Sequence, residues 1–143
     1  MTAAAKPKSA RHIPNSAERV LDAPGFVNDY YLNLIDWSSQ NVVAVALSNT
    51  LYLWNAANGQ IVDLMRTRNE SDIITSVSWT KDGHFIALGL SDGTTELWDA
   101  EAKRALRALS GHAARVSALS WNSSTLSSGS KVHYNSFFRS LIF

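Results

Sequence analysis

Histidine is the residue of this chain best suited to acid–base chemistry or metal binding, and its spacing argues against both. Four histidines stand far apart, at positions 12, 84, 112 and 133, and His112 has no carboxylate or second histidine at metal-ligand spacing. No cysteine is present, which excludes disulfides and thiolate sites. Neither a Gly-x-Ser-x-Gly elbow nor a phosphate-binding glycine loop occurs. The sequence predicts a protein that is not an enzyme, with no catalytic residue, metal or cofactor.

Charge and length exclude further classes of function. The chain has 143 residues, with 13 Lys and Arg against 12 Asp and Glu, a net charge of +1. Because this balance creates no general field for anions, neither nucleic acid nor a membrane is expected as a partner. Apolar runs such as residues 42–47 and 85–90 are far shorter than the roughly 18 residues of a bilayer span. Residues 1–10 lack the hydrophobic region of a signal peptide. With no cysteine, we expect one soluble domain of the cytoplasm and nucleus.

The spacing of the tryptophans indicates which structural elements would position a site. Trp37, Trp79 and Trp121 are spaced 42 residues apart, and each follows a short alternating apolar stretch. Trp54 and Trp98 are 44 residues apart, and each ends a strand-like run. A period of this length indicates a repeat architecture in which each copy is one supersecondary unit.

Within one period the local signals are those of strands and turns. Residues 73–79 alternate in polarity, as a strand does. An Asp-Gly turn at 82–83 leads to the nearly continuous apolar run at 85–90, which is typical of a buried strand. A second Asp-Gly turn at 92–93 leads to the strand that ends at Trp98. Residues 101–109 fit a helix or a strand, and we interpret them as an outer edge strand.

Four strands per period, with Trp98-Asp99 ending the third, predict an all-β WD-type propeller that is incomplete. We place two four-stranded blades at residues 30–66 and 73–109, and half of a third at 115–130. The tryptophans are then expected to pack between sheets. Trp54, Asp92, Trp98, Asp99 and His112 are predicted to hold structural positions of the WD repeat.

His112 is the start of a buried polar network in this interpretation. In WD blades a Gly-His before the inner strand places the imidazole near a Ser or Thr on the second strand, an Asp in the next turn and a Trp on the third strand. Gly111, His112 and a serine at 127 or 128 are present, but residues 131–135 contain no such Asp or Trp. The network of the third blade is therefore expected to be only partly satisfied, which is unfavourable in a buried site.

Motifs inside and before these blades resemble the fizzy family, the cell-division-cycle-twenty type of WD propeller that activates the anaphase-promoting complex. The resemblance extends from Arg11 to Ser130, and its segments occur in the family's order. They include Arg11-His12-Ile13-Pro14, Val20-Leu21-Asp22-Ala23-Pro24, Asn28-Asp29-Tyr30-Tyr31-Leu32-Asn33, Tyr52-Leu53-Trp54, Gly111-His112 and Leu126-Ser127-Ser128-Gly129-Ser130. The Leu-Asp-Ala-Pro and Asp-Tyr-Tyr-Leu-Asn segments are not shared by generic WD repeats.

The resemblance implies a substrate adaptor of a ubiquitin ligase rather than a catalyst. Such proteins bind destruction-box degrons between the first and last blades and KEN degrons on the top face, on cell-cycle proteins such as cyclins. The positions that match degron contacts are Asp22, Asp29, Tyr30 and Tyr52. Carboxylates pair with a basic degron residue and aromatic rings cover its aliphatic stem. Equally, Asp22 could set a turn before Ala-Pro, and both tyrosines could pack within the blade.

The chain also departs from the family pattern. The Asp-Arg-Tyr-Ile-Pro-x-Arg box and the terminal Ile-Arg dipeptide, both used for docking on the ligase, are absent. Residues 131–143 diverge where further blades would follow, as an out-of-frame or alternatively spliced end would, or as a basic amphipathic peptide would. We expect a flexible segment at 1–19, a partial propeller at 20–130 and this divergent tail. Binding to the anaphase-promoting complex is expected to be weakened or lost.

Two interpretations of function remain open at this point. In the first, the chain is a truncated activator whose partners are degron-bearing cell-cycle proteins and spindle-checkpoint proteins. Because the last blade is missing, weak or no binding of an isolated destruction-box peptide is expected. In the second, the chain is a generic WD-repeat scaffold fragment without independent activity, which is marginally stable because its sheet faces and edges are exposed.

Overall fold

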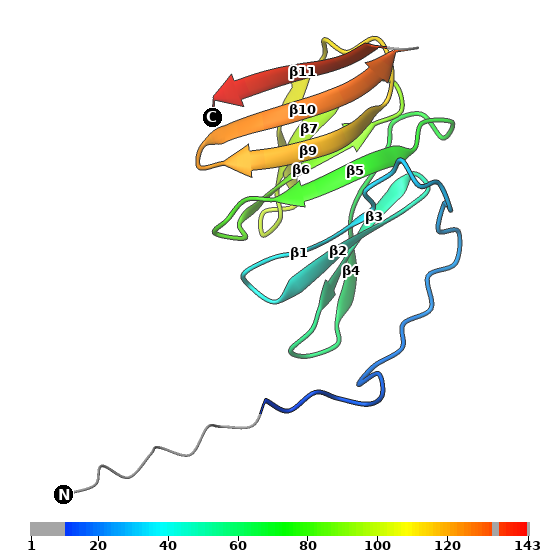
Figure 1. The fold of residues 1–143 in the computed structure, drawn as a ribbon, viewed down its shortest axis with the longest axis vertical. Helices are drawn as coiled ribbons and strands as arrows, with labels where there is room; N and C mark the ends of the chain where they lie inside the picture. Colours follow the sequence, from blue (N-terminus) through cyan, green and yellow to red (C-terminus); the bar gives the residue numbers. More distant parts are fainter. Residues whose placement is uncertain (1–10, 133–134, 143) are drawn as a thin grey trace, which may run out of the picture.

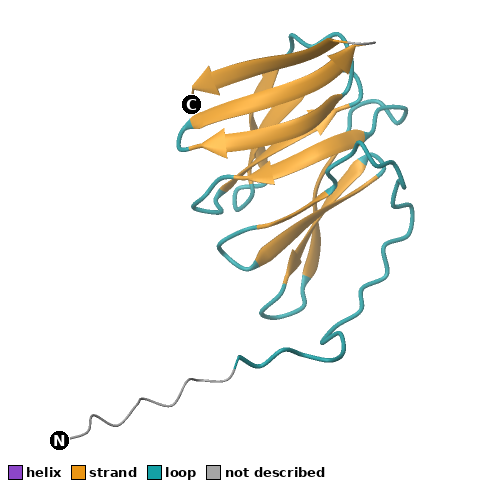
Figure 2. Ribbon diagram, in the orientation of Figure 1, coloured by secondary structure: helices purple, strands orange, loops and turns teal. Residues whose placement is uncertain are grey.

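The computed structural model describes residues 11–132 and 135–142, and all regular structure in these residues is β-strand (Figures 1 and 2). Eleven strands form three antiparallel sheets, in the orders β1-β2-β3-β4, β5-β6-β7-β8 and β11-β10-β9. The strands are β1 (Ile35–Trp37), β2 (Val42–Leu47), β3 (Thr50–Asn55), β4 (Ile61–Arg66), β5 (Ile74–Trp79), β6 (Phe85–Leu90), β7 (Thr95–Asp99), β8 (Arg104–Leu109), β9 (Val116–Asn122), β10 (Thr125–Val132) and β11 (Asn135–Ile142). The predicted all-β fold of incomplete propeller blades is confirmed. No helix capable of crossing a membrane occurs in the part of the chain that is described.

The first two sheets follow the predicted order of strands and turns. The apolar run at 85–90 forms the buried strand β6. At the turn that follows it, Gly93 has a φ of 91°, in the left-handed region that glycine adopts readily. The carboxylate of Asp92 accepts the backbone N–H of Thr94 at 2.8 Å, which closes the turn. The segment at 101–109, which fits a helix or a strand, forms the exposed edge strand β8.

The third sheet extends further than predicted. Half of a third blade was predicted at 115–130, and the structure adds a strand to it: β10 continues to Val132 and β11 pairs with it along its whole length, from Val132↔Asn135 to Thr125↔Ile142. An unpaired edge of β10 offers a row of backbone N–H and C=O groups, and the following segment satisfies them. The third blade therefore has three strands, although its last strand lacks the family's sequence.

The hydrophobic core lies between the first and second sheets, and a tryptophan connects each sheet to the preceding one. Trp79 is 6% exposed, and its indole Nε1 donates to the carbonyl oxygen of Asp36 at 3.2 Å. Trp121 repeats this contact with the carbonyl oxygen of Ser78, at 3.1 Å. Trp37 departs from the predicted packing between sheets, since it is 62% exposed. Its ring lies on the face of the first sheet that points away from the second.

Small and polar residues join the second sheet to the third. The hydroxyls of Thr75 and Ser76, both fully buried, donate to the carbonyl oxygen of Val116 at 2.7 and 2.6 Å. Gly89 lies against the same carbonyl, so closely that a Cβ built on it would stand 2.4 Å from the Val116 oxygen. The alternating polarity of residues 73–79 predicted faces of different polarity, whereas both faces of β5 are largely buried because each packs on a neighbouring sheet.

The predicted structural positions of the WD repeat have local partners. His112 Nε2 lies 2.8 Å from Ser128 Oγ, which confirms the predicted contact and selects the second of the two candidate serines. Trp98 donates its indole N–H to Glu96 at 2.8 Å. Asp99 accepts the backbone N–H of Ala102 at 2.8 Å and so caps the turn after β7. Each contact joins residues that are close in sequence or belong to one sheet, so each is local to its blade.

Candidate functional site

A groove on the outer face of the first sheet, the face that points away from the second sheet, brings together two of the four predicted degron contacts. The groove has a volume of about 580 Å³ and lies between residues 21–25 and strands β2 and β3. Asp22 and Tyr52 both line it. They are 30 residues apart in the chain, so only the folding of the segment before β1 across the sheet places the carboxylate and the phenol around one space.

Strand geometry explains why Tyr52 faces the groove. Alternate residues of a strand point to opposite faces of the sheet. Leu51 and Leu53 are 0% and 6% exposed and belong to the core between the sheets. Tyr52 and Trp54 therefore point to the outer face, where both line the groove. Tyr52 pairs with Val45 of β2, which supplies an apolar wall beside the phenol ring.

The segment that carries Asp22 has one contact with the sheet on its N-terminal side and a turn of its own on its C-terminal side. On one side the Arg19 guanidinium lies over the ring of Trp54, 5.9 Å from its centroid. On the other side Gly25 adopts a φ of 79°, and the N–H of Phe26 donates to the carbonyl oxygen of Ala23 at 3.3 Å. The cation–π contact and the turn together place the segment across the aromatic face of β3. Trp54, predicted as a structural position, also supports this segment.

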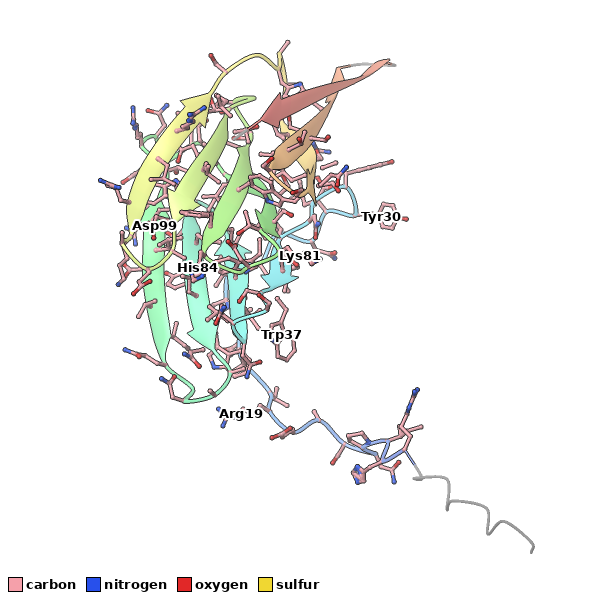
Figure 3. All side chains as sticks on the ribbon, turned by 90° about the vertical axis from the view of Figure 1, so that its left-hand side faces the viewer. Arg19, Tyr30, Trp37, Lys81, His84 and Asp99 are labelled. Atoms are coloured by element: carbon pink, nitrogen blue, oxygen red, sulfur yellow. The ribbon has the colours of Figure 1, made fainter. Side chains whose placement is uncertain are left out.

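Asp29 and Tyr30, the other two predicted contacts, lie outside the groove. Asp29 Oδ2 accepts a hydrogen bond from Arg115 Nη1 at 2.8 Å, and its Oδ1 accepts the backbone N–H of Tyr31 at 2.9 Å. The Tyr31 amide and the Arg115 guanidinium hold the pKa of Asp29 below its ordinary value of 3.8. Tyr30 is 95% exposed and projects away from the sheets (Figure 3). Sequence reasoning assigned no role to Arg115, and nothing local signals a partner 86 residues away.

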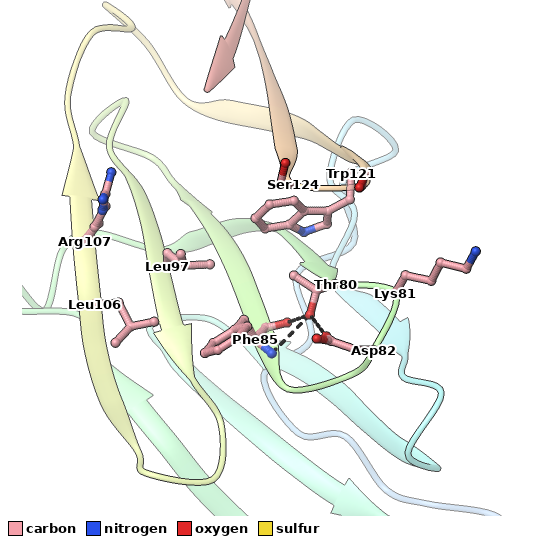
Figure 4. A pocket seen from close by; sticks show the side chains of 10 residues that line it. Thr80, Lys81, Asp82, Phe85, Leu97, Leu106, Arg107, Trp121 and Ser124 are labelled. Atoms are coloured by element: carbon pink, nitrogen blue, oxygen red, sulfur yellow. Dashed lines mark hydrogen bonds between the residues drawn. The ribbon is translucent and has the colours of Figure 1, made fainter. Parts of the chain in front are cut away.

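A second cavity, of about 630 Å³, lies between the second and third sheets and contains none of the predicted degron contacts. Trp121 projects toward the cavity from β9, and Phe85, Leu97 and Leu106 line it from the second sheet (Figure 4). Asp82 lies at its rim, where the Thr80 hydroxyl and then the backbone N–H of His84 lower the pKa of the carboxyl group. Polar and charged residues complete the lining: Thr80, Lys81, Asp82, Arg107, Ser123 and Ser124.

The chemistry of the first-sheet groove is that of binding. In residues 11–132 and 135–142 no group of three or more His, Asp or Glu side chains is placed to hold a metal ion. The groove combines the carboxylate of Asp22 with the phenol ring of Tyr52. Trp54 and Arg66 also line it, and the Trp54 ring already carries the Arg19 guanidinium. A carboxylate beside aromatic rings suits a basic side chain, because the charge pairs with the carboxylate while the aliphatic stem packs on the rings.

Comparison with known proteins places these sheets in a family. The family model for the WD40 domain of anaphase-promoting complex subunit 4 matches residues 35–124, which extend from the start of β1 to just beyond β9. This match covers more than half of the chain. The chain belongs to this WD40 family. Its first two sheets are accordingly WD40 blades, β9 lies within the same match, and the tryptophan period of 42 residues is the WD40 repeat.

Similarity to individual WD40 proteins narrows the comparison from the WD40 family to particular relatives. The chain is 53% identical over 123 residues to the anaphase-promoting complex subunit cdc20 of Dictyostelium discoideum, and 50% identical over 121 residues to the WD repeat-containing protein slp1 of Schizosaccharomyces pombe. These matches cover 86% and 85% of the chain. The chain spans about a quarter of the length of each relative (25%). The resemblance to the fizzy and Cdc20 family is confirmed.

The fold of this WD40 chain also has a solved counterpart. A chain in the crystal structure of the mitotic checkpoint complex superposes with a TM-score of 0.80 and 49% sequence identity. The superposition covers 91% of the present chain and 39% of the other. At this identity the likeness extends beyond the fold to the sequence of the blades.

Proposed function

We propose that this chain is part of a non-catalytic, substrate-recruiting activator of the anaphase-promoting complex, and that the groove of the first blade reads a basic residue of a degron. The observation that carries the proposal is the meeting of Asp22 and Tyr52 in one groove. Both positions match degron contacts of the family, and their chemistry suits an Arg or Lys side chain. The place of action that we infer is the cytoplasm and the nucleus.

The groove supports weak rather than tight recognition by this chain alone. Asp22 is exposed and the groove is bounded by one sheet and the segment before it. Exposed ion pairs contribute about 0.2–1 kcal/mol, and a peptide held along one wall stays largely hydrated. A second wall from another part of the propeller would desolvate the pair and strengthen it. We therefore expect a destruction-box peptide to bind this chain only at high concentration.

Asp29 and Tyr30 remain the proposed contacts for a KEN degron. Tyr30 offers an almost fully exposed ring. Asp29 already pairs with Arg115, so a basic peptide residue must compete with an internal guanidinium. The relative named as an anaphase-promoting complex subunit supports that complex as a proposed partner. The similar chain in the mitotic checkpoint complex supports spindle-checkpoint proteins as further proposed partners.

A peptide titration tests the groove. A fluorescently labelled destruction-box peptide is titrated with the 143-residue chain, and its anisotropy is compared with that of the same peptide carrying alanine at its basic residue. We expect saturable binding of the first peptide only. Asp22→Asn should weaken it about 1.4- to 5-fold, the range of an exposed ion pair. Tyr52→Ala should weaken it at least as much, because the ring covers the aliphatic stem.

Glu70→Gln is the matched control, since it also removes an exposed carboxylate but lies in the connection between the first two blades. This variant should bind as the parent chain does. Equal binding of the two peptides, or equal affinity of the parent and Asp22→Asn chains, would refute the proposed reading of a basic residue. Absence of any peptide binding would favour a scaffold fragment without independent activity.

A further inference from the structure

A polar pocket of about 290 Å³ lies beside the second sheet, where the connection from β4 to β5 passes the turn between β6 and β7. Thr67 and Asp72 line it from that connection, and Asp92 and Glu96 line it from the second blade. None of its lining residues lies on the outer face of the first or third sheet, and none belongs to the groove that contains Asp22. The pocket is therefore a separate feature of the second blade and its connections.

Glu96 is the charged group that determines the chemistry of this pocket. Alternate residues of β7 point to opposite faces of the sheet, and Glu96 shares its face with Trp98, which packs against the core between the first two sheets. Only 9% of Glu96 is exposed. Its Oε2 accepts the indole N–H of Trp98 at 2.8 Å, whereas its Oε1 has no hydrogen-bond or ion-pair partner among the described residues. Because a buried carboxylate without a counter-charge is unfavourable, a cation in this pocket would be stabilised.

The other charged residues of the pocket add to this negative charge. Asp92 accepts the backbone N–H and the hydroxyl of Thr94, and Asp72 accepts the side-chain amide of Asn69. These donors are neutral, so they leave the charge of both aspartates in place. Arg68, an exposed lining residue, forms no ion pair within residues 11–132 and 135–142. Three carboxylates thus share the pocket with a single guanidinium, and its net charge is negative.

The kind of cation follows from the arrangement of these groups. In the described part of the chain no three His, Asp or Glu side chains are placed to hold a metal ion, so the carboxylates of the pocket suit an organic cation better than a metal. An ammonium has three donors that can be met from several sides, whereas a guanidinium is a planar fork that pairs best with one carboxylate. Leu90 and Ala108 also line the pocket and offer apolar contact to an aliphatic stem.

We propose that this pocket binds the side chain of a lysine carried by a segment of a partner protein. The ammonium pairs with Oε1 of Glu96, and the stem packs on Leu90 and Ala108. Asp92 and Arg68 are exposed, so the pocket is accessible from solvent. Free lysine is disfavoured, because its own α-carboxylate would enter a negatively charged site, whereas a lysine within a peptide carries neutral amides there.

Nuclear magnetic resonance titration of the full 143-residue chain tests this site. The probe is a short peptide of glycine and serine with one central lysine, capped at both ends. The indole N–H of Trp98 is the reporter, because it donates to Glu96, while the Trp54 indole reports on the separate groove. At concentrations up to about 10 mM, the lysine peptide should shift the Trp98 resonance saturably. The same peptide carrying acetyl-lysine should leave it unchanged, because it has no charge.

Two substitutions should have opposite effects on this binding. Glu96→Gln keeps the size of the side chain and an oxygen for Trp98 but removes the charge. It should weaken binding by about tenfold or more, the range for hydrogen bonds to charged groups. Arg68→Gln should tighten binding, because the pocket loses its own cation. Glu101→Gln is the matched control, since it removes an exposed carboxylate outside the pocket, in the turn after β7, and should bind as the parent does.

Several outcomes would overturn the proposal: an unchanged Trp98 resonance, an equal response to the acetyl-lysine peptide, equal affinity of the parent and Glu96→Gln chains, or weaker binding by Arg68→Gln. Putrescine, a diamine without a peptide backbone, provides a further comparison. A response to it equal to that of the peptide would contradict the assignment to a partner protein. The probe contains no degron and the two sites share no residue, so the result is independent of the degron proposal.

Discussion

Gly89→Ala tests the packing between the second and third blades, on which the position of the whole third sheet depends. Gly89 lies in the middle of β6, where backbone geometry alone favours alanine over glycine by about 0.5–1 kcal/mol. The atoms around Gly89 have the opposite effect, because a methyl group there would collide with them and lower the free energy of unfolding. A Cβ at this position would stand 2.3 Å from Ser76 Oγ and 2.4 Å from the carbonyl oxygen of Val116, both far inside contact distance.

The magnitude follows from how far Val116 must move. To reach even the 3.0 Å that real Cβ contacts observe, its oxygen must retreat by about 0.6 Å from the position at 2.4 Å. The same oxygen accepts the buried hydroxyls of Thr75 and Ser76, and a net hydrogen bond contributes about 0.5–1.5 kcal/mol. Overpacking of a core costs about 1–3 kcal/mol. After the backbone gain is subtracted, we expect Gly89→Ala to lower the free energy of unfolding by about 1–3 kcal/mol.

The assay is equilibrium unfolding in urea, followed by far-ultraviolet circular dichroism of the parent and Gly89→Ala chains. The expected result is a lower midpoint for the variant. A double variant that adds Ser76→Ala should recover only part of the loss, because the Val116 oxygen still obstructs the new methyl group. A midpoint equal to or above that of the parent would refute the reasoning, since the backbone effect alone predicts stabilisation.

Two further predictions concern contacts that join distant parts of the chain. Asp29→Asn should destabilise the chain at neutral pH by removing the ion pair with Arg115. Because the pKa of Asp29 is lowered in the folded chain, its contribution is present above the ordinary value of 3.8 and is lost as the pH falls through the lowered pKa. Urea midpoints of the parent and variant should therefore converge as the pH is lowered below 3.8, and a difference that grew in acid would contradict this origin. Trp79→Phe should cost about 0.5–1.5 kcal/mol for the lost indole hydrogen bond, measured at pH 7, and an unchanged midpoint would show that the bond contributes nothing.

Much of the fold was predictable because its signals are local. The alternation of residues 73–79, the apolar run at 85–90 and the Asp-Gly turns correspond to β5, β6 and the turns around them. Asp92 closes its turn with a residue two positions along the chain, so spacing in the sequence was sufficient to predict it. The contact of His112 with a serine of the second strand was expected from the Gly-His pattern of WD blades, which left Ser127 and Ser128 as alternatives, and the structure shows it with Ser128.

The missed features depend on partners that the local pattern does not identify. Strand β11 forms because an unpaired edge of β10 is available, although residues 135–142 lack the expected motif. Trp37 has the same local sequence setting as Trp79, yet it is 62% exposed. The segment that crosses the outer face of the first sheet lies against β2 and β3 rather than over the Trp37 ring. The prediction for Asp29 did not include Arg115, which reaches it from the loop before β9.

The sequence by itself determined the WD40 repeat, the turns and the residue types available for binding, because these follow from side-chain periodicity and from neighbours within a few positions. Only the tertiary structure decided which of those residues share a site. Asp22 and Tyr52 line one groove because the segment before β1 folds across β3, whereas Asp29 is drawn to Arg115. The physical reason is that strand periodicity assigns a side chain to a face of its sheet, while the packing of distant segments determines what lies opposite that face.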